Sequence, residues 1–74
     1  MYKETFPQRM KKARTDAGYT QIQVADSTGI SQSIISNIEN GNREPSIETL
    51  GTLIDFYEVP ADWILGTGMH KKNS

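Results

Sequence analysis

The apolar residues of this chain repeat at helical spacing in short, separate segments. In the first segment, Thr5 is the expected N-cap of a helix that runs from about Phe6 or Pro7 to Ala17, and Gly18 is its expected left-handed stop. The apolar stripe of this helix, spaced i, i+4, i+7 and i+11, consists of Phe6, Met10, Ala13 and Ala17. The segment is therefore expected to form one amphipathic helix.

The next two segments predict a pair of short helices joined by a tight turn. Thr20 and Gln23 have the spacing of a capping box, so a second helix is expected to begin after Thr20 and to end at Gly29. Ser31 is the expected cap of a third helix, which covers about residues 32–39. The positions of the pair that are expected to face the core are Val24, Ala25, Thr28, Ile35 and Ile38.

The remaining segments predict two more helices. Ser46 is the expected cap of a fourth helix, whose broad apolar face consists of Ile47, Leu50, Leu53, Ile54 and Tyr57. Pro60 interrupts the pattern, and a short last helix is expected over about residues 61–65. Because no segment alternates like a β-strand, we expect an all-α fold of five helices in one domain over residues 1–66. Residues 67–74 have no apolar periodicity and are expected to form a flexible C-terminal tail.

The composition limits the chemistry that this chain can perform. Its 74 residues include no cysteine and a single histidine, His70, which excludes disulfides and zinc sites built from thiolates or histidines. The carboxylates are scattered and no glycine-rich phosphate loop is present, so we expect no enzyme, metal, cofactor or small-molecule ligand. No apolar run approaches the ~20 residues that cross a bilayer, and the charged segment from Met1 to Arg14 is unlike a secretory signal. A cytoplasmic protein with no membrane partner is expected.

The charges are unevenly distributed along the chain. The formal net charge is −1, yet residues 1–18 carry five basic and two acidic side chains, whereas residues 43–66 set Arg43 against five carboxylates. No lysine or arginine lies between Tyr19 and Asn42. A nucleic-acid-binding protein usually presents a basic surface, and this sequence predicts one only weakly.

Residues 20–41 carry the most specific signal in the sequence. Two helices of about eight residues joined through Gly29, Ile30 and Ser31 match the helix-turn-helix plan, because the glycine permits a positive φ and the isoleucine fills the angle between the helices. The blocks that extend the match are Thr20-Gln21, Val24-Ala25, Gln32-Ser33, Ile35-Ser36, Ile38-Glu39-Asn40-Gly41, Arg43-Glu44-Pro45-Ser46, Leu50, Leu53, Val59 and Asp62-Trp63-Ile64-Leu65-Gly66. Over about residues 6–66 the chain resembles the Cro/CI, or XRE-type, regulators of phages and bacteria, which have a lambda repressor-like domain.

The resemblance implies a DNA-binding surface. In the family the third helix enters the major groove of a double-stranded DNA operator, which implies this role for residues 32–39 and a groove-facing set of Gln32, Ser33, Ser36 and Asn37. Glutamine and asparagine suit base recognition because their amides both donate and accept hydrogen bonds. The residues implied to contact phosphates, or to flank the bases, are Thr20, Gln21, Asn40, Asn42 and Arg43. An alternative, in which the side chain only solvates or caps a helix, is open for Gln21, Ser33, Ser36 and Asn40.

The resemblance further implies an ion pair and a dimer. Arg14 and Glu39 occupy positions that in many members form a buried salt bridge between the first and third helices. The alternative is two unrelated surface charges. Because family members that bind operators often pair near their last helix, a homodimer on a two-fold DNA site is also implied.

Two isoleucines stand where the family usually has polar residues. Ile22 lies off the stripe that contains Val24 and Ala25, and a binding role is favoured for it. Ile34 fits either the flank of the core or a contact with a thymine methyl group or a protein. A second hypothesis therefore stands beside the DNA-binding regulator: an antirepressor or modulator that binds a partner repressor protein through Ile22 and Ile34 and alters its DNA binding.

Overall fold

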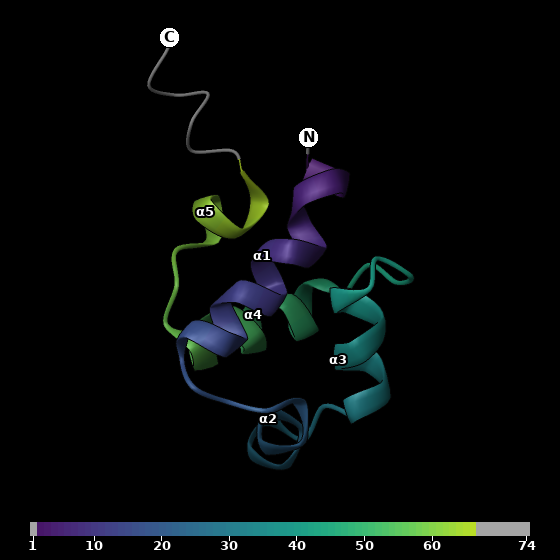
Figure 1. Cartoon of the computed structure of the whole chain (residues 1–74), viewed down its shortest axis with the longest axis vertical. Coiled ribbons are helices and arrows are strands. Elements are labelled where there is room, and N and C mark those ends of the chain that lie inside the picture. Colours follow the sequence, from purple (N-terminus) through teal and green to yellow (C-terminus); the bar gives the residue numbers. More distant parts are fainter. Residues whose placement is uncertain (1, 67–74) are drawn as a thin grey trace, which may run out of the picture.

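The computed structural model describes residues 2–66, with side chains from residue 5 onward, and every regular element in this part of the chain is a helix. The helices are α1 (Tyr2–Asp16), α2 (Gln21–Thr28), α3 (Gln32–Glu39), α4 (Ile47–Tyr57) and α5 (Ala61–Leu65). In Figure 1, α1 runs through the middle of the molecule, with α2 and α3 at one end and α5 at the other. The all-α, five-helix prediction is confirmed, whereas the expected tail of residues 67–74, including His70, lies outside the described residues.

Helix α1 begins earlier and ends earlier than the sequence pattern predicts. It starts at Tyr2, so Thr5 is not its N-cap, and Pro7 lies inside the helix rather than in its first turn. A proline in a helix removes one backbone hydrogen bond and crowds the preceding turn. The apolar residues on either side of it, Phe6 and Met10, are both buried, and their packing keeps the helix continuous. Ala17 is exposed because it lies beyond the last helical residue, which corrects its place in the apolar stripe.

The caps of α2 and α3 are confirmed. The Thr20 hydroxyl accepts a hydrogen bond from the Gln23 amide, and the Gln23 side chain accepts one from the Thr20 amide, which completes the capping box. Gly29 ends α2 in the left-handed conformation, with a φ of 80°. Ser31 then caps α3 by accepting a hydrogen bond from the amide of Ile34. Local side-chain chemistry therefore defines both helices and the turn between them.

Most of the core positions expected in the helix pair are buried. Val24 on α2, and Ile35 and Ile38 on α3, are each at most 1% exposed. Ala25 is only partly buried but packs against the core, whereas Thr28 is half-buried and outside the core cluster, which corrects the expectation for Thr28. The Thr28 hydroxyl donates to the carbonyl of Val24 and accepts from the amide of Ile30, so it stabilises the turn rather than filling the core.

Helix α4 places its apolar residues unevenly. Leu53 and Tyr57, one turn apart, set its buried side, and Leu50 and Ile54 are half-buried beside them. Ile47 is 89% exposed, so its assignment to the apolar face is wrong. It is the first residue of α4 and lies on the same side of the helix as the half-buried Ile54, seven residues later, so its exposure comes from its place at the helix end rather than from its angle around the helix.

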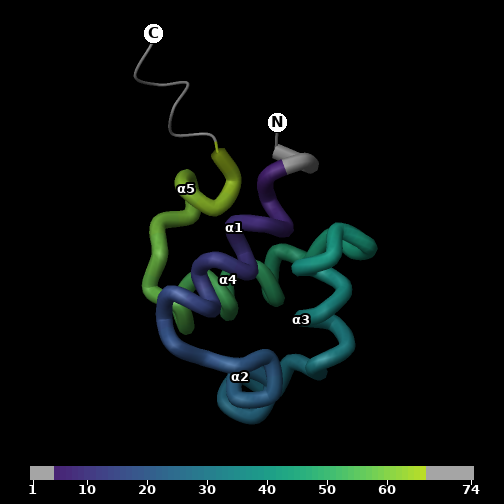
Figure 2. Tube along the Cα trace, viewed as in Figure 1, coloured from purple at the N-terminus to yellow at the C-terminus, as the bar shows by residue number. Residues whose placement is uncertain are grey.

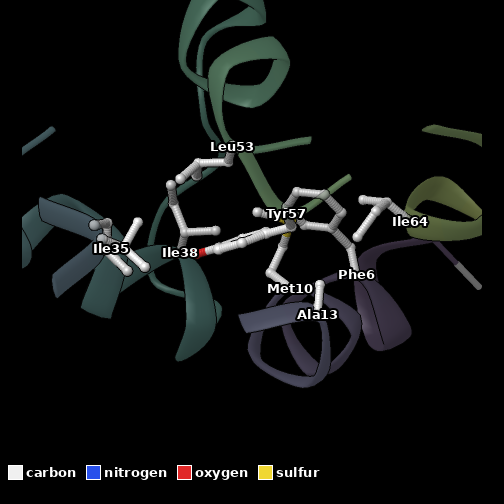
Figure 3. Packing of buried hydrophobic residues seen from close by; sticks show 9 residues of the cluster. Phe6, Met10, Ala13, Ile35, Ile38, Leu53, Tyr57 and Ile64 are labelled. Atoms are coloured by element: carbon white, nitrogen blue, oxygen red, sulfur yellow. The ribbon is translucent and has the colours of Figure 1, made fainter. Parts of the chain in front are cut away.

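The core draws side chains from all five helices. Figure 3 shows residues from α1, α3, α4 and α5 converging on Tyr57, and Val24 adds the contribution of α2. At the other end of the molecule, Arg9 on α1 donates a hydrogen bond to the backbone oxygen of Trp63 and lies 5.5 Å from the centre of its ring. This contact ties α5 to the middle of α1, an arrangement that can be followed along the tube in Figure 2.

Candidate nucleic-acid interface

One face of helix α3 packs against the core, and its first turn is exposed. Ile35 and Ile38 are buried against the core, while Gln32 and Ser33 in the first turn are exposed. Figure 1 shows α3 along one edge of the molecule, with α2 below it. The end of α3 that carries Gln32 is therefore accessible to a large partner.

The rest of the expected groove-facing set is less accessible. Ser36 and Asn37 are half-buried, so they are less accessible than their implied groove-facing role requires. The backbone oxygen of Asn37 accepts a hydrogen bond of 2.9 Å from the amide of Asn42 and so supports the loop after α3. The side chain of Asn40 donates to the Ser36 hydroxyl at 3.4 Å.

The loop after α3 carries the cation expected to meet phosphate. Asn42 and Arg43 are both exposed, and Arg43 is the one lysine or arginine between residues 15 and 70. The loop begins at Gly41 with a φ of 80°, where a Cβ atom would lie 3.5 Å from the ring of Pro7 on α1. The backbone therefore passes close to α1 where this loop begins.

Arg14 and Glu39 form a buried ion pair that joins α1 to α3. The Arg14 Nε donates to one Glu39 carboxylate oxygen at 2.7 Å and its Nη2 to the other at 2.9 Å, while its Nη1 donates to the backbone oxygen of Tyr19 at 2.9 Å. The Arg14 side chain is 10% exposed and that of Glu39 is 4% exposed. The hydrogen bond to Glu39 raises the pKa of Arg14, against the opposing effect of burial, so the guanidinium is charged.

Gln21 connects this ion pair to the exposed start of α3. Its side-chain nitrogen donates to Glu39 at 3.1 Å, and its side-chain oxygen accepts from the Gln32 amide at 3.4 Å. Gln21 is half-buried, whereas Thr20 beside it is exposed and uses its hydroxyl as the cap of α2. The connection could have been inferred from the sequence, because Gln21 and Gln32 are the first residues of two successive helices.

Tyr57 is a second polar group of the interior that the sequence did not identify. It is 6% exposed, and its hydroxyl is the one buried side-chain oxygen or nitrogen of the described residues that lacks a hydrogen-bond partner. Figure 3 shows its hydroxyl end beside Ile38. Burial and, to a lesser degree, the negative charge of Glu39 raise the pKa of Tyr57 to about 12, with Arg14 acting in the opposite direction.

The two unusual isoleucines differ in their surroundings. Ile22 on α2 is 58% exposed, whereas Ile34 on α3 is half-buried and packs against the core. Ile34 therefore occupies the flank of the core, one of the two positions considered for it. Ile22 is an apolar side chain exposed on the surface of α2.

Metal sites and membrane-spanning helices are both absent from the described residues. Residues 2–66 contain no group of three or more histidine, cysteine, aspartate or glutamate residues that could hold a metal ion. Within the same range, no helix has the length and apolar character needed to cross a membrane.

Comparison with known proteins agrees with this geometry. A family model described as helix-turn-helix matches residues 10–64. The HTH-type transcriptional regulator ImmR of Bacillus subtilis (strain 168) is 41% identical over 66 residues, which are 88% of this chain and 52% of ImmR. The SPbeta prophage-derived uncharacterized HTH-type transcriptional regulator YonR of the same organism is 38% identical over 60 residues, 81% of this chain and 56% of YonR.

A shorter relative is matched over most of its length. The uncharacterized HTH-type transcriptional regulator YazB of B. subtilis (strain 168) is 39% identical over 62 residues, which are 84% of this chain and 90% of YazB. The chain thus spans about half the length of ImmR and YonR and nearly all of YazB.

Proposed function

The chain belongs to the helix-turn-helix family, of the Cro/CI or XRE type, and from this premise we propose that it is a sequence-specific DNA-binding regulator of transcription. The observation that carries the proposal is the exposed first turn of α3, held in place by the buried Ile35 and Ile38. An α-helix presented in this way fits the major groove of B-form DNA. The protein acts in the cytoplasm, where it binds an operator and has no catalytic role.

Each residue type suits its part in this contact. Gln32 reads a base edge, because its amide can both donate and accept, and Ser33 approaches the groove beside it. Arg43, in the loop after α3, neutralises a phosphate, and Asn42 contacts the backbone next to it. The half-buried Ser36 and Asn37 follow on the same face, and the exposed Asn40 lies at its end.

Two copies of the chain bind one two-fold site. Helix-turn-helix domains of this kind place the recognition helices of a dimer one helical turn of DNA apart, about 34–36 Å. Each copy then contributes its own Gln32 and Arg43 to a half-site. Pairing doubles the contacts and offsets the small positive charge that each copy offers to DNA.

The proposal is tested by titrating the purified protein with the DNA upstream of its own gene at low salt, by fluorescence anisotropy. Gln32→Ala is expected to cost about 1–3 kcal/mol against the selected site, and Arg43→Ala is expected to weaken binding to every sequence and to flatten the salt dependence by about one unit of slope. Gln8→Ala, on the exposed surface of α1, is the control and binds like the parent. If Gln32→Ala and Arg43→Ala bind DNA as tightly as the control does, the placement of α3 in the major groove is contradicted.

A second candidate function is favoured by the surface of α2. Ile22 is 58% exposed, and residues 20–42 carry the exposed Asp26 but no cation. A surface of this kind suits a partner with an apolar pocket and a basic rim, such as the DNA-binding face of another regulator. In this alternative the protein is an antirepressor that covers that face and alters its DNA binding.

One variant separates the two functions. Ile22→Asp is expected to abolish binding to the product of the neighbouring regulatory gene, measured by calorimetry, and to leave the helix content and the affinity for DNA unchanged. The control Gln8→Asp, which adds the same charge on the exposed surface of α1, retains the partner. If Ile22→Asp binds that protein as well as the parent does, the antirepressor function is contradicted.

A further inference from the structure

Helix α4 presents a row of apolar positions to solvent that the core does not use. Its buried side is set by Leu53 and Tyr57, which lie in the core in Figure 3. Beside them, Ile47, Gly51 and Ile54 follow one another at spacings of four and three residues and fall within about 60° around the helix. Ile47 is 89% exposed, Gly51 is exposed and Ile54 is half-buried. We refer to these three residues as the α4 stripe.

Two members of the α4 stripe do not help the domain to fold. An isoleucine that is 89% exposed removes little of its apolar surface from water. A glycine inside a helix is less favourable than an alanine, and a Cβ atom at Gly51 would meet nothing within 4 Å. Packing among the described residues therefore explains neither Ile47 nor Gly51. Residues that oppose local stability in this way are typical of functional sites, and exposed apolar surface is typical of sites that bind proteins.

Carboxylates lie along the solvent side of the α4 stripe. Glu48 and Asp55 are exposed and, at about 100° per residue, lie beside Gly51 on the same flank of the helix. Helix α4 contains no lysine or arginine, and the ion pairs among the described residues involve neither carboxylate. The negative flank repels the phosphates of nucleic acids and of anionic lipids, so this face suits a protein with positive charge.

We propose that the α4 stripe is a docking site for a helix of another protein, one that carries apolar side chains at matching spacing and lysine or arginine beside them. Helices dock through apolar residues spaced i, i+4 and i+7, which is the spacing of the stripe. Gly51 lets the partner helix approach the backbone closely, and the carboxylate flank attracts its cations. The site is separate from α3, proposed to meet DNA, and from Ile22 on α2.

Charge complementarity selects this occupant over a second copy of the chain. If two copies packed antiparallel about Gly51, Ile47 of one copy would meet Ile54 of the other, and the two carboxylate flanks would also come together. Glu48 of one copy would then lie beside Asp55 of the other, and like charges at such a contact repel. A basic helix has no such conflict with the stripe.

The first experiment uses a designed peptide as the probe. It is a fluorescein-labelled helical peptide with leucine at positions i, i+4 and i+7 and a lysine beside each leucine, and a second peptide has glutamate in place of every lysine. Fluorescence anisotropy with the full chain is expected to show that the lysine peptide binds about tenfold more tightly. The double variant Glu48→Gln/Asp55→Asn is expected to lose most of this difference. Equal binding of the two peptides by the parent, or binding of neither, would overturn the proposal.

A substitution in the α4 stripe separates docking from general attraction between charges. Ile47→Asp adds a negative charge, which would strengthen binding of the lysine peptide if charge alone held it. Docking predicts the opposite, a loss of about tenfold or more, because an apolar anchor is removed. The matched control Ile22→Asp makes the same change at the other strongly exposed isoleucine and is expected to bind at least as tightly as the parent. A loss in both variants, or in neither, would overturn the proposal.

A second substitution tests the close approach without weakening the fold. Glutamine has a higher helix propensity than glycine, so Gly51→Gln should raise the melting temperature. The same variant is expected to bind the lysine peptide more weakly, because its side chain covers the stripe, and unchanged binding would overturn the close approach. In sedimentation equilibrium without peptide, Ile47→Asp is expected to have the same oligomeric state as the parent. A dimer that Ile47→Asp disperses would assign the stripe to a second copy and overturn the proposal of a basic helix.

Discussion

Single buried polar groups have opposite energetic roles in this protein. Arg14 donates three hydrogen bonds and carries its charge beside Glu39, so its burial is compensated. The hydroxyl of Tyr57 is buried with no partner, so its lost hydration is not compensated. Both groups lie in the interior, and for each one the sign of the change in the free energy of unfolding on substitution can be predicted.

Removing Arg14 is expected to destabilise the domain strongly. Arg14→Ala leaves the Glu39 carboxylate buried without its counter-charge, which typically costs about 3–5 kcal/mol. The measurement is the free energy of unfolding in urea, followed by circular dichroism. Lys12→Ala is the matched control, because the Lys12–Asp16 pair has exposed side chains and contributes at most about 1 kcal/mol. A loss for Arg14→Ala no larger than that of the control would show that the buried pair adds nothing to stability.

Removing the Tyr57 hydroxyl is expected to stabilise the domain. Tyr57→Phe keeps the ring in the core and removes the unpaired oxygen, which should raise the free energy of unfolding by about 1 kcal/mol at neutral pH. Thermal melts of the two proteins at equal concentration measure the difference. A lower melting temperature for Tyr57→Phe would show that the hydroxyl has a stabilising partner, such as a bound water.

The same residue predicts sensitivity to alkali. The folded-state pKa of Tyr57 is about 12, above the ordinary value near 10, so the fold favours its neutral form. Its contribution to stability is complete below pH 10 and is lost as the pH rises to 12, by about 1.4 kcal/mol for each pH unit between the two values. Urea titrations at several pH values between 9 and 12 measure this loss. Tyr57→Phe should show a smaller loss than the parent over the same range.

At the scale of the helices, the ends were more predictable than the faces. Thr20, Ser31 and Ser46 each cap the helix that follows them, and each was identified from the residue type and its place before an apolar segment. Capping depends on atoms within three residues of each other, so the sequence contains the whole interaction. The start of α1 was not predictable in this way, because no capping residue marks it: the helix begins at Tyr2, before the expected start, and Pro7 lies inside it.

Two glycines are expected to respond in opposite ways to the same substitution. Gly51 lies within α4 and Gly29 ends α2 with a φ of 80°, and a Cβ atom at either position meets nothing within 4 Å. Gly51→Ala should therefore stabilise by about 0.5–1 kcal/mol through helix propensity, whereas Gly29→Ala should destabilise by about 1–2 kcal/mol through backbone strain. Chemical unfolding of both variants and of the parent measures the change in the free energy of unfolding for each substitution. Equal signs for the two variants would show that contacts, rather than backbone conformation, decide their effect.

At the scale of the whole molecule, the distribution of charge determines how strongly the proposed DNA binding should depend on salt. The described part of α1 carries basic residues that include the exposed Lys11 and Lys12. Helices α2 and α3 contain no lysine or arginine, and the loop after α3 contains Arg43 alone. Each phosphate contact made by a cation adds about 0.9 to the slope of the logarithm of the binding constant against that of the salt concentration. The slope for one copy is therefore expected to be small.

Adding a cation to the loop is expected to increase affinity without changing specificity. Asn42→Lys places a positive charge beside Arg43 on the exposed loop, so binding should strengthen for all DNA sequences and the salt slope should grow by about 0.9 for each copy bound. Titrations at several salt concentrations with two unrelated duplexes measure both effects. Glu48→Gln, which removes a negative charge from α4 without adding a cation, should change the slope less. An unchanged slope for Asn42→Lys would place the loop away from the phosphates.

Some features of the candidate site were predictable from the sequence, and others depend on how the helices pack. The exposure of Gln32 and Arg43 follows from their place at a helix start and in a loop, and both were proposed from the sequence. The burial of Asn37 and the contact between Gln21 and Gln32 were not, because they depend on the angle at which α2 and α3 pack. Sequence spacing alone does not specify that angle to the precision of a hydrogen bond.

The amino-acid sequence by itself determined the helical class, the number of helices, the turn at Gly29 and the identity of the caps, because each depends on neighbouring residues. The tertiary structure decided which side chains are inside. Ile47 and Ile34 have the same chemistry, yet one is exposed and the other packs against the core, and Tyr57 is buried without a hydrogen-bond partner. These outcomes depend on where distant segments meet, and a side chain is buried only when another helix supplies the surface that covers it.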